Sequence, residues 1–525
     1  MKTKVTILFL LAVFISSNIH SQVIADKRQI LIDFNKTSGI HSQMYAECIG
    51  AGRANEGLRA DWQEQLKYVK EECGFKYIRM HGLLTDDMGV YFEDKAGNPV
   101  YNWQYIDKLF DYLLSIKMKP FVELGFMPNA LASGSKTVFW WRGNITPPKD
   151  YQKWSNLIKN LVLHCKERYG DNEIKTWYFE VWNEPNLKDI FFSGDQNEYF
   201  KLYTITANAI KDVSKAYKVG GPATAGSAWV PEFISYCSTH KVPVDFISTH
   251  TYGVNKGFVD TDGSTGTVLS QNPNSVSGDI VNTRKQIANS AMPWLELHYT
   301  EWSSSYTPTD PIHDSYHQAA YILDKIKNVG SAPNSMSYWV FTDIFEENGP
   351  RTTPFHGGFG LLNYQGIKKP AFYSYQFLHR LGEIEFVNKD AASWACKDKK
   401  GNIQLLWWNF TITHPGDSVN NQVFYKRDLP AKAKGSVQIS LQNIPEGNYT
   451  LKIYQVGYRV NDAYSTYMDL GSPKQITRDN LNTINNKNSG KPVITSMIKI
   501  GAAKSFEKMF PLRENDVFLL ELNKN

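Results

Sequence analysis

Residues 177–186 read Trp-Tyr-Phe-Glu-Val-Trp-Asn-Glu-Pro-Asn, an apolar run that ends abruptly in polar side chains and a proline. Residues 177–182 have the length and the aromatic and β-branched content of a buried strand. Pro185 cannot extend a ladder of strand hydrogen bonds, so we expect the chain to turn directly after Asn183 and Glu184. A buried strand that presents polar groups at its carboxyl end is typical of parallel α/β folds.

Similar apolar runs lie on both sides of this one and alternate with amphipathic helical patterns. The predicted strands are 45–50, 77–81, 120–125, 177–182, 219–222, 246–250, 295–300 and 336–341. The predicted helices between them include 62–73, 105–116, 154–169, 199–217 and 315–329. This alternation predicts an α/β fold, a (β/α)8 TIM barrel over residues 44–381. A doubly wound open sheet is the main alternative, but no Gly-x-Gly-x-x-Gly or Walker-type loop follows a strand.

The pattern changes near residue 382. Short β-type runs at 404–408, 437–441 and 449–456 are bounded by turn residues, which predicts an antiparallel β-sandwich domain over residues 382–525. The N-terminal segment 22–43 contains one more β-type run and is expected to join this sandwich. The polar, Asn-rich stretch 474–491 is expected to be a surface loop.

The first residues have the features of a secretory signal peptide. Lys2 and Lys4 precede an apolar run at 5–15, and small polar residues follow it. The run is shorter than the ~20 residues that a membrane-spanning helix needs, so no membrane span is expected. We therefore predict that residues 1–21 are removed and that the protein is secreted or periplasmic.

Composition excludes several classes of function. The net charge is only +5, with Lys and Arg scattered along the chain, which argues against a nucleic-acid partner. The 5 cysteines are widely spaced without a Cys-x-x-Cys pair, and no His-Glu-x-x-His is present. Neither a disulfide framework, a metal site nor a cofactor is therefore expected. Aromatic residues reach 14%, which suits either a sugar-binding cleft or a large core.

In a parallel barrel the functional side chains lie at the carboxyl ends of the strands, so polar and aromatic residues at these ends are candidates for the site. The candidates at the predicted strand ends are Arg79, His81, Asn183, Glu184, His250, Tyr252, Glu301, Trp339, Asp343, Glu346 and Glu347. They come from several different strands but converge on one face. Glu180 lies inside its strand, where a buried ion pair is the preferred interpretation.

Glu184 and Glu301 end the fourth and seventh strands, which face each other across a barrel mouth. Hydrolysis of a glycosidic bond needs one acid to protonate the leaving oxygen and a second carboxylate beside the anomeric carbon. Two glutamates in matched positions therefore favour glycosidase chemistry. The alternative is that each glutamate is an ion-pair partner at the barrel rim.

At this point the chain resembles glycoside hydrolase family 39, the β-xylosidase and α-L-iduronidase family. The resemblance lies in blocks that occur in the expected order, at 77–87, 179–186, 298–302, 345–350 and 354–361. It implies an accessory β-sandwich and retention of anomeric configuration. It also implies that Glu184 is the general acid/base and Glu301 the nucleophile.

The resemblance assigns further roles around the sugar. Asn183 is similar to the residue that binds the 2-hydroxyl, although an Asx turn is an alternative. The resemblance places His250 and Tyr252 in the substrate pocket, with Tyr252 near the nucleophile. It places Trp339 as an aromatic platform for the sugar, and core packing is the alternative for this residue. A structural role is the alternative for His250, as it is for His81.

The remaining expectations concern charge. The pKa of Glu184 should be raised, by Trp182 and by the charge of Glu301, and Arg79 should support Glu301. Asp343, Glu346 and Glu347, on the last barrel loop, are expected to bind hydroxyls.

The identity of the sugar depends on Tyr252. In the iduronidase branch a lysine stands at this position, two residues after the strand-six histidine, whereas tyrosine offers no charge for a uronate. The leading prediction is therefore an exo-acting β-D-xylosidase that acts on an oligosaccharide or glycoside. An α-L-arabinosidase or an α-L-iduronidase-like enzyme is the alternative within the family. A catalytically inactive sugar-binding barrel is the alternative of another class, and the oligomeric state stays open.

Overall fold

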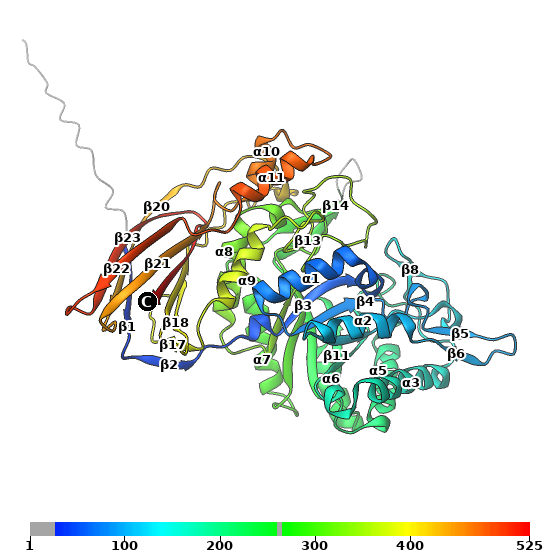
Figure 1. Ribbon diagram of the computed structural model, residues 1–525. Coiled ribbons are helices and arrows are strands. Elements are labelled where there is room, and N and C mark those ends of the chain that lie inside the picture. Colours follow the sequence, from blue (N-terminus) through cyan, green and yellow to red (C-terminus); the bar gives the residue numbers. More distant parts are fainter. Residues whose placement is uncertain (1–26, 260–264) are drawn as a thin grey trace, which may run out of the picture.

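The computed structural model describes residues 27–259 and 265–525. The predicted signal peptide, residues 1–21, lies outside the described residues. Within them, no helix has the length and apolar character to cross a membrane. Figure 1 shows a barrel domain surrounded by helices and, beside it, a smaller domain of β-sheets.

The barrel is closed by eight parallel strands, each paired with the next along the chain, and the last pairs with the first. These strands are β3 (Cys48–Arg53), β4 (Tyr77–His81), β7 (Lys119–Leu124), β10 (Tyr178–Val181), β11 (Lys218–Thr224), β12 (Phe246–Tyr252), β15 (Glu296–Ser303) and β16 (Ser335–Tyr338). The predicted TIM barrel is confirmed. Every predicted strand overlaps a strand of the barrel, because near-continuous apolar runs are what a sheet buried on both faces requires.

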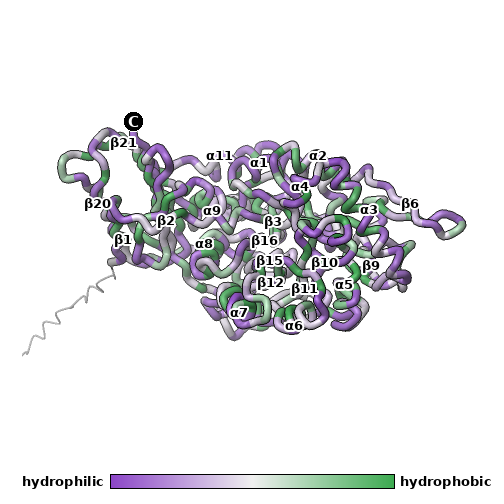
Figure 2. Tube along the Cα trace, turned by 90° about the horizontal axis from the view of Figure 1, so that it is seen from below, coloured by the Kyte–Doolittle hydropathy of each residue, from purple (hydrophilic) through white to green (hydrophobic). Residues whose placement is uncertain are grey.

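Helices surround this ring of strands, as Figure 2 shows from below. They are α1 (Ala60–Cys73), α2 (Gln104–Ser115), α3 (Tyr151–Tyr169), α4 (Asp171–Ile174), α5 (Gln196–Val213), α6 (Val230–His240), α7 (Ser277–Ala288), α8 (His317–Val329) and α9 (Pro370–His379). In α1, for example, Trp62, Leu66, Val69 and Cys73 form the buried face, at the three- and four-residue spacing of an amphipathic helix. All five cysteines are buried and free.

Short antiparallel hairpins follow three of the barrel strands at their carboxyl ends and build the rim of the mouth. They are β5 (Tyr91–Glu93) with β6 (Pro99–Tyr101), β8 (Thr137–Val138) with β9 (Gly143–Asn144), and β13 (Val254–Val259) with β14 (Thr265–Leu269). These hairpins were not predicted from the sequence. The strands β5, β6, β8 and β9 are too short to show hydrophobic periodicity, and β13 and β14 have no regular alternation of apolar and polar residues.

The second domain packs a three-stranded sheet on a seven-stranded sheet. The first contains β1 (Lys27–Asp33), β20 (Ala433–Gln442) and β23 (Ser505–Arg513). The second contains β2 (Thr37–Ile40), β17 (Ile384–Phe386), β18 (Ser393–Lys397), β19 (Ile403–Trp408), β21 (Gly447–Val456), β22 (Ile494–Ile500) and β24 (Val517–Lys524). The N-terminal segment thus contributes β1 and β2. β1 runs parallel to β20, so the sandwich is not wholly antiparallel.

Two helices, α10 (Ala463–Asp469) and α11 (Arg478–Lys487), are inserted between β21 and β22. Figure 1 shows them above the barrel. The prediction of a surface loop over 474–491 is therefore wrong for the α11 segment. Thr477 caps α11 by accepting a hydrogen bond from the backbone of Asn480, and Ile484 is buried with Phe355 of the barrel domain. With Ile484 as its one buried residue, α11 shows too little apolar periodicity to be predicted as a helix from the sequence.

Candidate active site

Arg79, in the middle of β4, is the central cation of the barrel mouth and is completely buried. Its Nε donates to Glu180 at 2.5 Å, its Nη1 to Glu301 at 2.6 Å and its Nη2 to Asn183 at 2.9 Å. The same Nη2 lies 2.9 Å from a carboxylate oxygen of Glu123. Burial opposes the charge on Arg79, but the surrounding carboxylates outweigh it and raise its pKa. Glu180 thus lies in the buried ion pair that the sequence predicted.

The chain that follows β10 has a strained backbone. Trp182 and Glu184 have positive φ angles of 73° and 44°, a conformation that costs a non-glycine residue roughly 1–2 kcal/mol. Two hydrogen bonds hold it: the Glu184 N–H donates to the carbonyl of Ala223 at 2.8 Å, and the Trp182 indole donates to the carbonyl of Phe191 at 2.8 Å. The turn that Pro185 predicted is therefore fixed by β11 and by the loop that contains Phe191.

Asn183 lies inside this turn and is buried. Because its Oδ1 accepts from Arg79, the amide orientation is set, and Nδ2 remains as a donor without an acceptor among the described residues. A fixed donor beside two carboxylates suits a sugar hydroxyl, the role that the resemblance implied.

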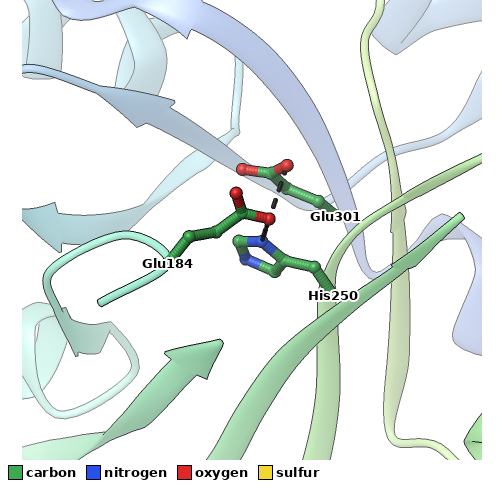
Figure 3. Close-up of side chains that lie close together, drawn as sticks. All are labelled: Glu184, His250 and Glu301. Carbon is green, nitrogen blue, oxygen red and sulfur yellow. Dashed lines mark hydrogen bonds and ion pairs between the residues drawn. The ribbon is translucent and has the colours of Figure 1, made fainter. Parts of the chain in front are cut away.

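Glu184 and Glu301 point toward each other across the mouth, with His250 of β12 beside both (Figure 3). His250 Nδ1 lies 2.9 Å from Glu184 Oε1 and 3.6 Å from Glu301 Oε2. One ligand atom of each of the three residues lies within 4.8 Å of the others. Retaining glycosidases hold their carboxyl groups roughly 5–5.5 Å apart, whereas inverting enzymes separate them by roughly 6.5–9.5 Å. The short separation favours the retaining mechanism.

Both oxygens of Glu301 accept hydrogen bonds. Arg79 donates to Oε1 at 2.6 Å, and the hydroxyl of Tyr252 donates to Oε2 at 2.6 Å. Burial and the nearby Glu301 raise the pKa of Tyr252 well above its usual value, so the hydroxyl keeps its proton. Glu184, His250 and Glu301 together offer ligand atoms for a metal ion, but the guanidinium of Arg79 already supplies a positive charge beside Glu301. The arrangement fits a nucleophile better.

The protonation of His250 follows from its neighbours. Thr300 Oγ1 donates its only proton to Glu180 at 2.7 Å, so it can only accept from His250 Nε2, which lies 3.1 Å away. Burial, together with Arg79, lowers the pKa of His250 well below its usual value, and the ring is neutral. A neutral ring with its proton on Nε2 must accept at Nδ1. The partner there is Glu184, which therefore donates.

This arrangement agrees with the charge environment of Glu184. Burial first, and then the charge of Glu301, raise the pKa of Glu184 well above the ordinary value of a glutamate. Glu184 is thus protonated near neutral pH, which is the state that a general acid needs. The charge of Glu301 is thus a cause of the raised pKa, as expected, and burial is the larger cause.

His81 is held by a group that the sequence analysis missed. Its Nδ1 lies 2.7 Å from Glu123 of β7, while its Nε2 lies 3.6 Å from Glu301 and 3.7 Å from Glu347. These last distances are too long for direct hydrogen bonds and leave Nε2 available to a substrate hydroxyl. Burial lowers the pKa of His81 to about 3, so the ring is neutral.

Trp339 directly follows β16 and lines the base of the mouth. Its ring packs against the ring of His81, with 4.8 Å between centroids, and lies over the guanidinium of Arg79. A side chain at Gly50 would collide with it, because a Cβ there would lie 2.5 Å from the indole. Only 2% of Trp339 is exposed, so the ring packs as a wall, and its use as a sugar platform stays a prediction.

The three carboxylates predicted on the strand-eight loop lie in different places. Glu347 faces the mouth near His81, and burial, with the charge of Glu301, raises its pKa well above the usual value. Glu346 points away, and its two oxygens accept from Arg59 at 3.0 Å and Arg53 at 2.7 Å. The structure therefore brings Glu347, but not Glu346, to the other site residues.

Asp343 is also turned away from the mouth. Its Oδ2 accepts from Lys369 at 3.1 Å, its Oδ1 accepts from the backbone of Gly360 at 2.7 Å, and Lys369 also bonds Asp314. All three charged side chains are buried. The structure gives Asp343 the position of a loop anchor, and its predicted contact with sugar hydroxyls is not supported by this geometry.

Three supporting residues were missed, namely Glu56, Glu123 and Thr300. Glu123 pairs in register with Glu180 on the neighbouring strand, and a lone carboxylate inside each of two apolar strands was the available signal. Glu56 is buried and accepts from the backbone of Glu346 at 2.9 Å. No local pattern marked Thr300, since a threonine is ordinary in a strand.

Comparison with known proteins agrees with this geometry. The family described as "Glycosyl hydrolases family 39" matches residues 28–503. The chain belongs to glycoside hydrolase family 39. A protein of Caldicellulosiruptor saccharolyticus named beta-xylosidase is 41% identical, covering 86% of this chain and 90% of that protein. One of Geobacillus stearothermophilus with the same name is 37% identical, covering 91% and 92%.

Among solved structures, a family 39 enzyme from Xanthomonas axonopodis pv. citri has a TM-score of 0.92 and 42% identity, covering 95% of this chain and 98% of that one. Barrel and sandwich thus recur together in a family 39 enzyme. This family 39 chain is a glycoside hydrolase.

Proposed function

We propose that the protein is a retaining, exo-acting β-D-xylosidase that releases terminal xylose from oligosaccharides or glycosides. The observation that carries the proposal is the hydrogen bond from Tyr252 to Glu301. It puts a neutral phenol at the position where a uronate-binding enzyme needs a cation. Arg79, the cation at the base of the mouth, already donates to Glu180, Glu301 and Asn183. The names of the two relatives at 41% and 37% identity support the same sugar.

The mechanism follows from the positions of the protons. In the first step Glu184 gives its proton to the leaving oxygen, the bond from that oxygen to the anomeric carbon breaks, and Glu301 forms an ester with this carbon. Esterification removes the negative charge of Glu301, which was one cause of the raised pKa of Glu184. Glu184 is then ionised and takes a proton from water. The water oxygen attacks the anomeric carbon, and Glu301 leaves as a carboxylate with net retention.

The decisive experiment is a comparison of substrates. We expect an aryl β-D-xyloside to be turned over with a higher kcat/KM than an aryl α-L-arabinoside or an aryl α-L-iduronide. NMR of the first product should show the β-anomer. A uronide or an arabinoside that is turned over as fast as the xyloside would refute the proposed sugar specificity, and an initial α-anomer would refute retention.

The nucleophile can be tested separately. Glu301→Ala should abolish turnover, and azide or formate should partly restore it by occupying the space of the lost carboxylate. An undiminished rate in Glu301→Ala would refute the assignment of the nucleophile.

We also propose that the protein is exported. The support is the basic and then apolar sequence of residues 1–21. N-terminal sequencing of the mature protein from the periplasm or medium would test this, and an intact Met1 in the cytoplasm would refute it.

A further inference from the structure

The hairpin formed by β8 and β9 lies between β7 and α3 in the chain, and it crosses the mouth to the strand-eight loop. At its tip the backbone N–H of Trp140 donates to the carbonyl of Glu347 at 2.7 Å. The ring of Trp140 lies against Gly349, where a Cβ would be 3.2 Å from the indole. In the barrel β3 and β4 separate β7 from β16, so the tip bridges the carboxyl ends of these two strands.

Below the tip, two aromatic side chains fill the space over these strand ends. The ring of Phe139 stacks on that of His81, with 5.8 Å between centroids and 28° between planes. Trp141 covers Gly82, directly after β4, where a Cβ would lie 3.1 Å from the indole. The guanidinium of Arg53, at the end of β3, is 5.7 Å from the centroid of the same indole. The tip therefore packs directly on the ends of β3 and β4.

The hairpin is held at its base as well as at its tip. The buried side chain of Asn144 donates to the carbonyl of Gly134 at 2.9 Å and to the side chain of Asn129 at 3.0 Å. At the tip, Phe139 and Arg142 have positive φ angles of 65° and 57°. Non-glycine residues keep this conformation only where the surrounding structure holds them in it. The tip is thus a fixed part of the rim.

The positions of the site residues show which part of a substrate lies under the tip. In the proposed mechanism Glu184 protonates the leaving oxygen, so the leaving group lies on its side of Glu301. Oε2 of Glu301 lies 3.6 Å from His250, the partner of Glu184, whereas Oε1 lies 3.6 Å from His81. Nε2 of His81 is in turn 3.7 Å from Glu347. The bound xylose therefore extends from Glu301 toward His81 and Glu347, and its non-reducing end lies beneath the hairpin.

We propose that the tip, residues 139–142, makes the enzyme exo-acting, because it occupies the space into which a further sugar at the non-reducing end would extend. In a β-1,4-linked chain this sugar is attached through the 4-hydroxyl of the bound xylose. On the side of Glu184 the rim is more open, since 45% of Tyr306, which lies beside Tyr252, is exposed. Leaving groups of different length can pass there. The proposal rests on the proposed function and names the element that restricts cleavage to terminal xylose.

An aryl β-1,4-xylobioside distinguishes the two modes of cleavage. The wild type should release xylose first and the aryl alcohol only after a lag, because a closed pocket admits the terminal sugar alone. Replacement of residues 139–142 by Asn-Gly removes the tip and keeps the pairing of Val138 with Gly143, because this dipeptide suits a two-residue hairpin turn. We expect this variant to lose the lag and to release xylobiose together with the aryl alcohol. Its turnover of an aryl β-xyloside should fall but stay measurable, since Glu347 loses one backbone hydrogen bond.

Point variants provide a second test that leaves the hairpin backbone intact. Phe139→Ala removes the ring over His81 and should shorten the lag and yield some xylobiose. Trp294→Ala is the matched control, because this tryptophan is 71% exposed and precedes β15 at the opposite end of the barrel. It should keep the wild-type lag. An unchanged lag without xylobiose in both hairpin variants, while they still hydrolyse the aryl xyloside, would overturn the proposal.

A binding measurement tests the closed end without turnover. In calorimetric titration the wild type should bind 4-O-methyl-xylose about tenfold or more weakly than xylose, because an additional methyl group in a closed pocket changes affinity by roughly that factor. The shortened hairpin should reduce this ratio, and an equal ratio in wild type and variant would refute the role of the tip. Failure of the proposed function would be seen differently. The wild type would then release xylobiose without a lag or would not hydrolyse aryl β-xylosides.

Discussion

Thr300 determines which nitrogen of His250 carries a proton, and its replacement by valine tests that assignment. Thr300→Val keeps the shape of the side chain but removes the hydroxyl that accepts from His250 Nε2 at 3.1 Å and donates to Glu180 at 2.7 Å. The buried Nε2 proton then has no acceptor, which costs roughly 1–3 kcal/mol. His250 can avoid this cost by carrying its proton on Nδ1 instead, where it would donate to Glu184.

The change reverses the hydrogen bond to the general acid. In the wild type Glu184 donates to His250 and its protonated form is stabilised; in the variant His250 donates and the ionised form is stabilised. One pKa unit corresponds to about 1.4 kcal/mol, so a hydrogen-bond difference of that order lowers the pKa of Glu184 by about 1 unit. The alkaline limb of the pH profile of kcat/KM, which reports the acid in the free enzyme, should move to lower pH by the same amount.

The assay is the pH dependence of kcat/KM for an alkyl β-xyloside, whose poor leaving group needs protonation. A dinitrophenyl xyloside, which leaves without assistance, should show a smaller shift in the same variant. Thr300→Ser is the matched control, because it keeps the hydroxyl and should keep the wild-type profile. An alkaline limb that does not move in Thr300→Val, with a Tm close to that of Thr300→Ser, would refute the proton assignment.

Further predictions concern the nucleophile, the strand-eight loop and the pH dependence of stability. Tyr252→Phe removes a 2.6 Å hydrogen bond to Glu301. Since hydrogen bonds to charged groups contribute about 1.5–3 kcal/mol, kcat/KM for an aryl xyloside should fall about 10- to 100-fold. An unchanged kcat/KM would contradict a role of Tyr252 in supporting the nucleophile. Asp343→Asn leaves the buried Lys369 with less compensating charge. It should destabilise the fold by up to about 3 kcal/mol, seen as a lower Tm, without a change in KM. A raised KM at an unchanged Tm would instead support the predicted contact between Asp343 and the sugar. Burial raises the pKa of Glu56 to about 8. Above about pH 4.5 the folded state therefore keeps a proton that the unfolded state has lost. The contribution of this proton to stability decreases as the pH rises from about 4.5 toward 8. Glu56→Gln has no such proton to lose, so its Tm should fall less than that of the wild type between pH 5 and 8, and equal slopes would exclude this contribution.

The barrel could be predicted from sequence because its signals are local. The strand at 77–81 coincides with β4, and the helix at 62–73 lies within α1, since apolar periodicity fixes which face of each element is buried. Glu184 and Glu301 could be singled out for a similar reason, because the end of a parallel strand is a position that the sequence reveals.

The partners of these residues could not be predicted in the same way. Whether Glu346 or Glu347 faces the mouth depends on which of them meets Arg53, on a strand end almost 300 positions away along the chain. The reassignment of Asp343 has the same origin, because Lys369 reaches it from the start of α9. Such pairings depend on how loops fold over the barrel, and periodicity carries no information on that arrangement.

The barrel mouth holds more carboxyl groups than one guanidinium can compensate, and this imbalance explains how its protons are distributed. Arg79 contacts Glu180, Glu123 and Glu301, while burial raises the pKa values of Glu123, Glu184 and Glu347. A low-dielectric site cannot hold all these groups as anions, so most of them keep a proton.

The same constraint links the two steps of catalysis. When Glu301 becomes an ester, one negative charge disappears beside Arg79, and the site can accept the new charge on Glu184 that arises as it protonates the leaving group. The total charge of the mouth is thus the same in the free enzyme and in the glycosyl-enzyme. The proton that Glu184 gives to the leaving group therefore balances the negative charge that Glu301 loses when the ester forms.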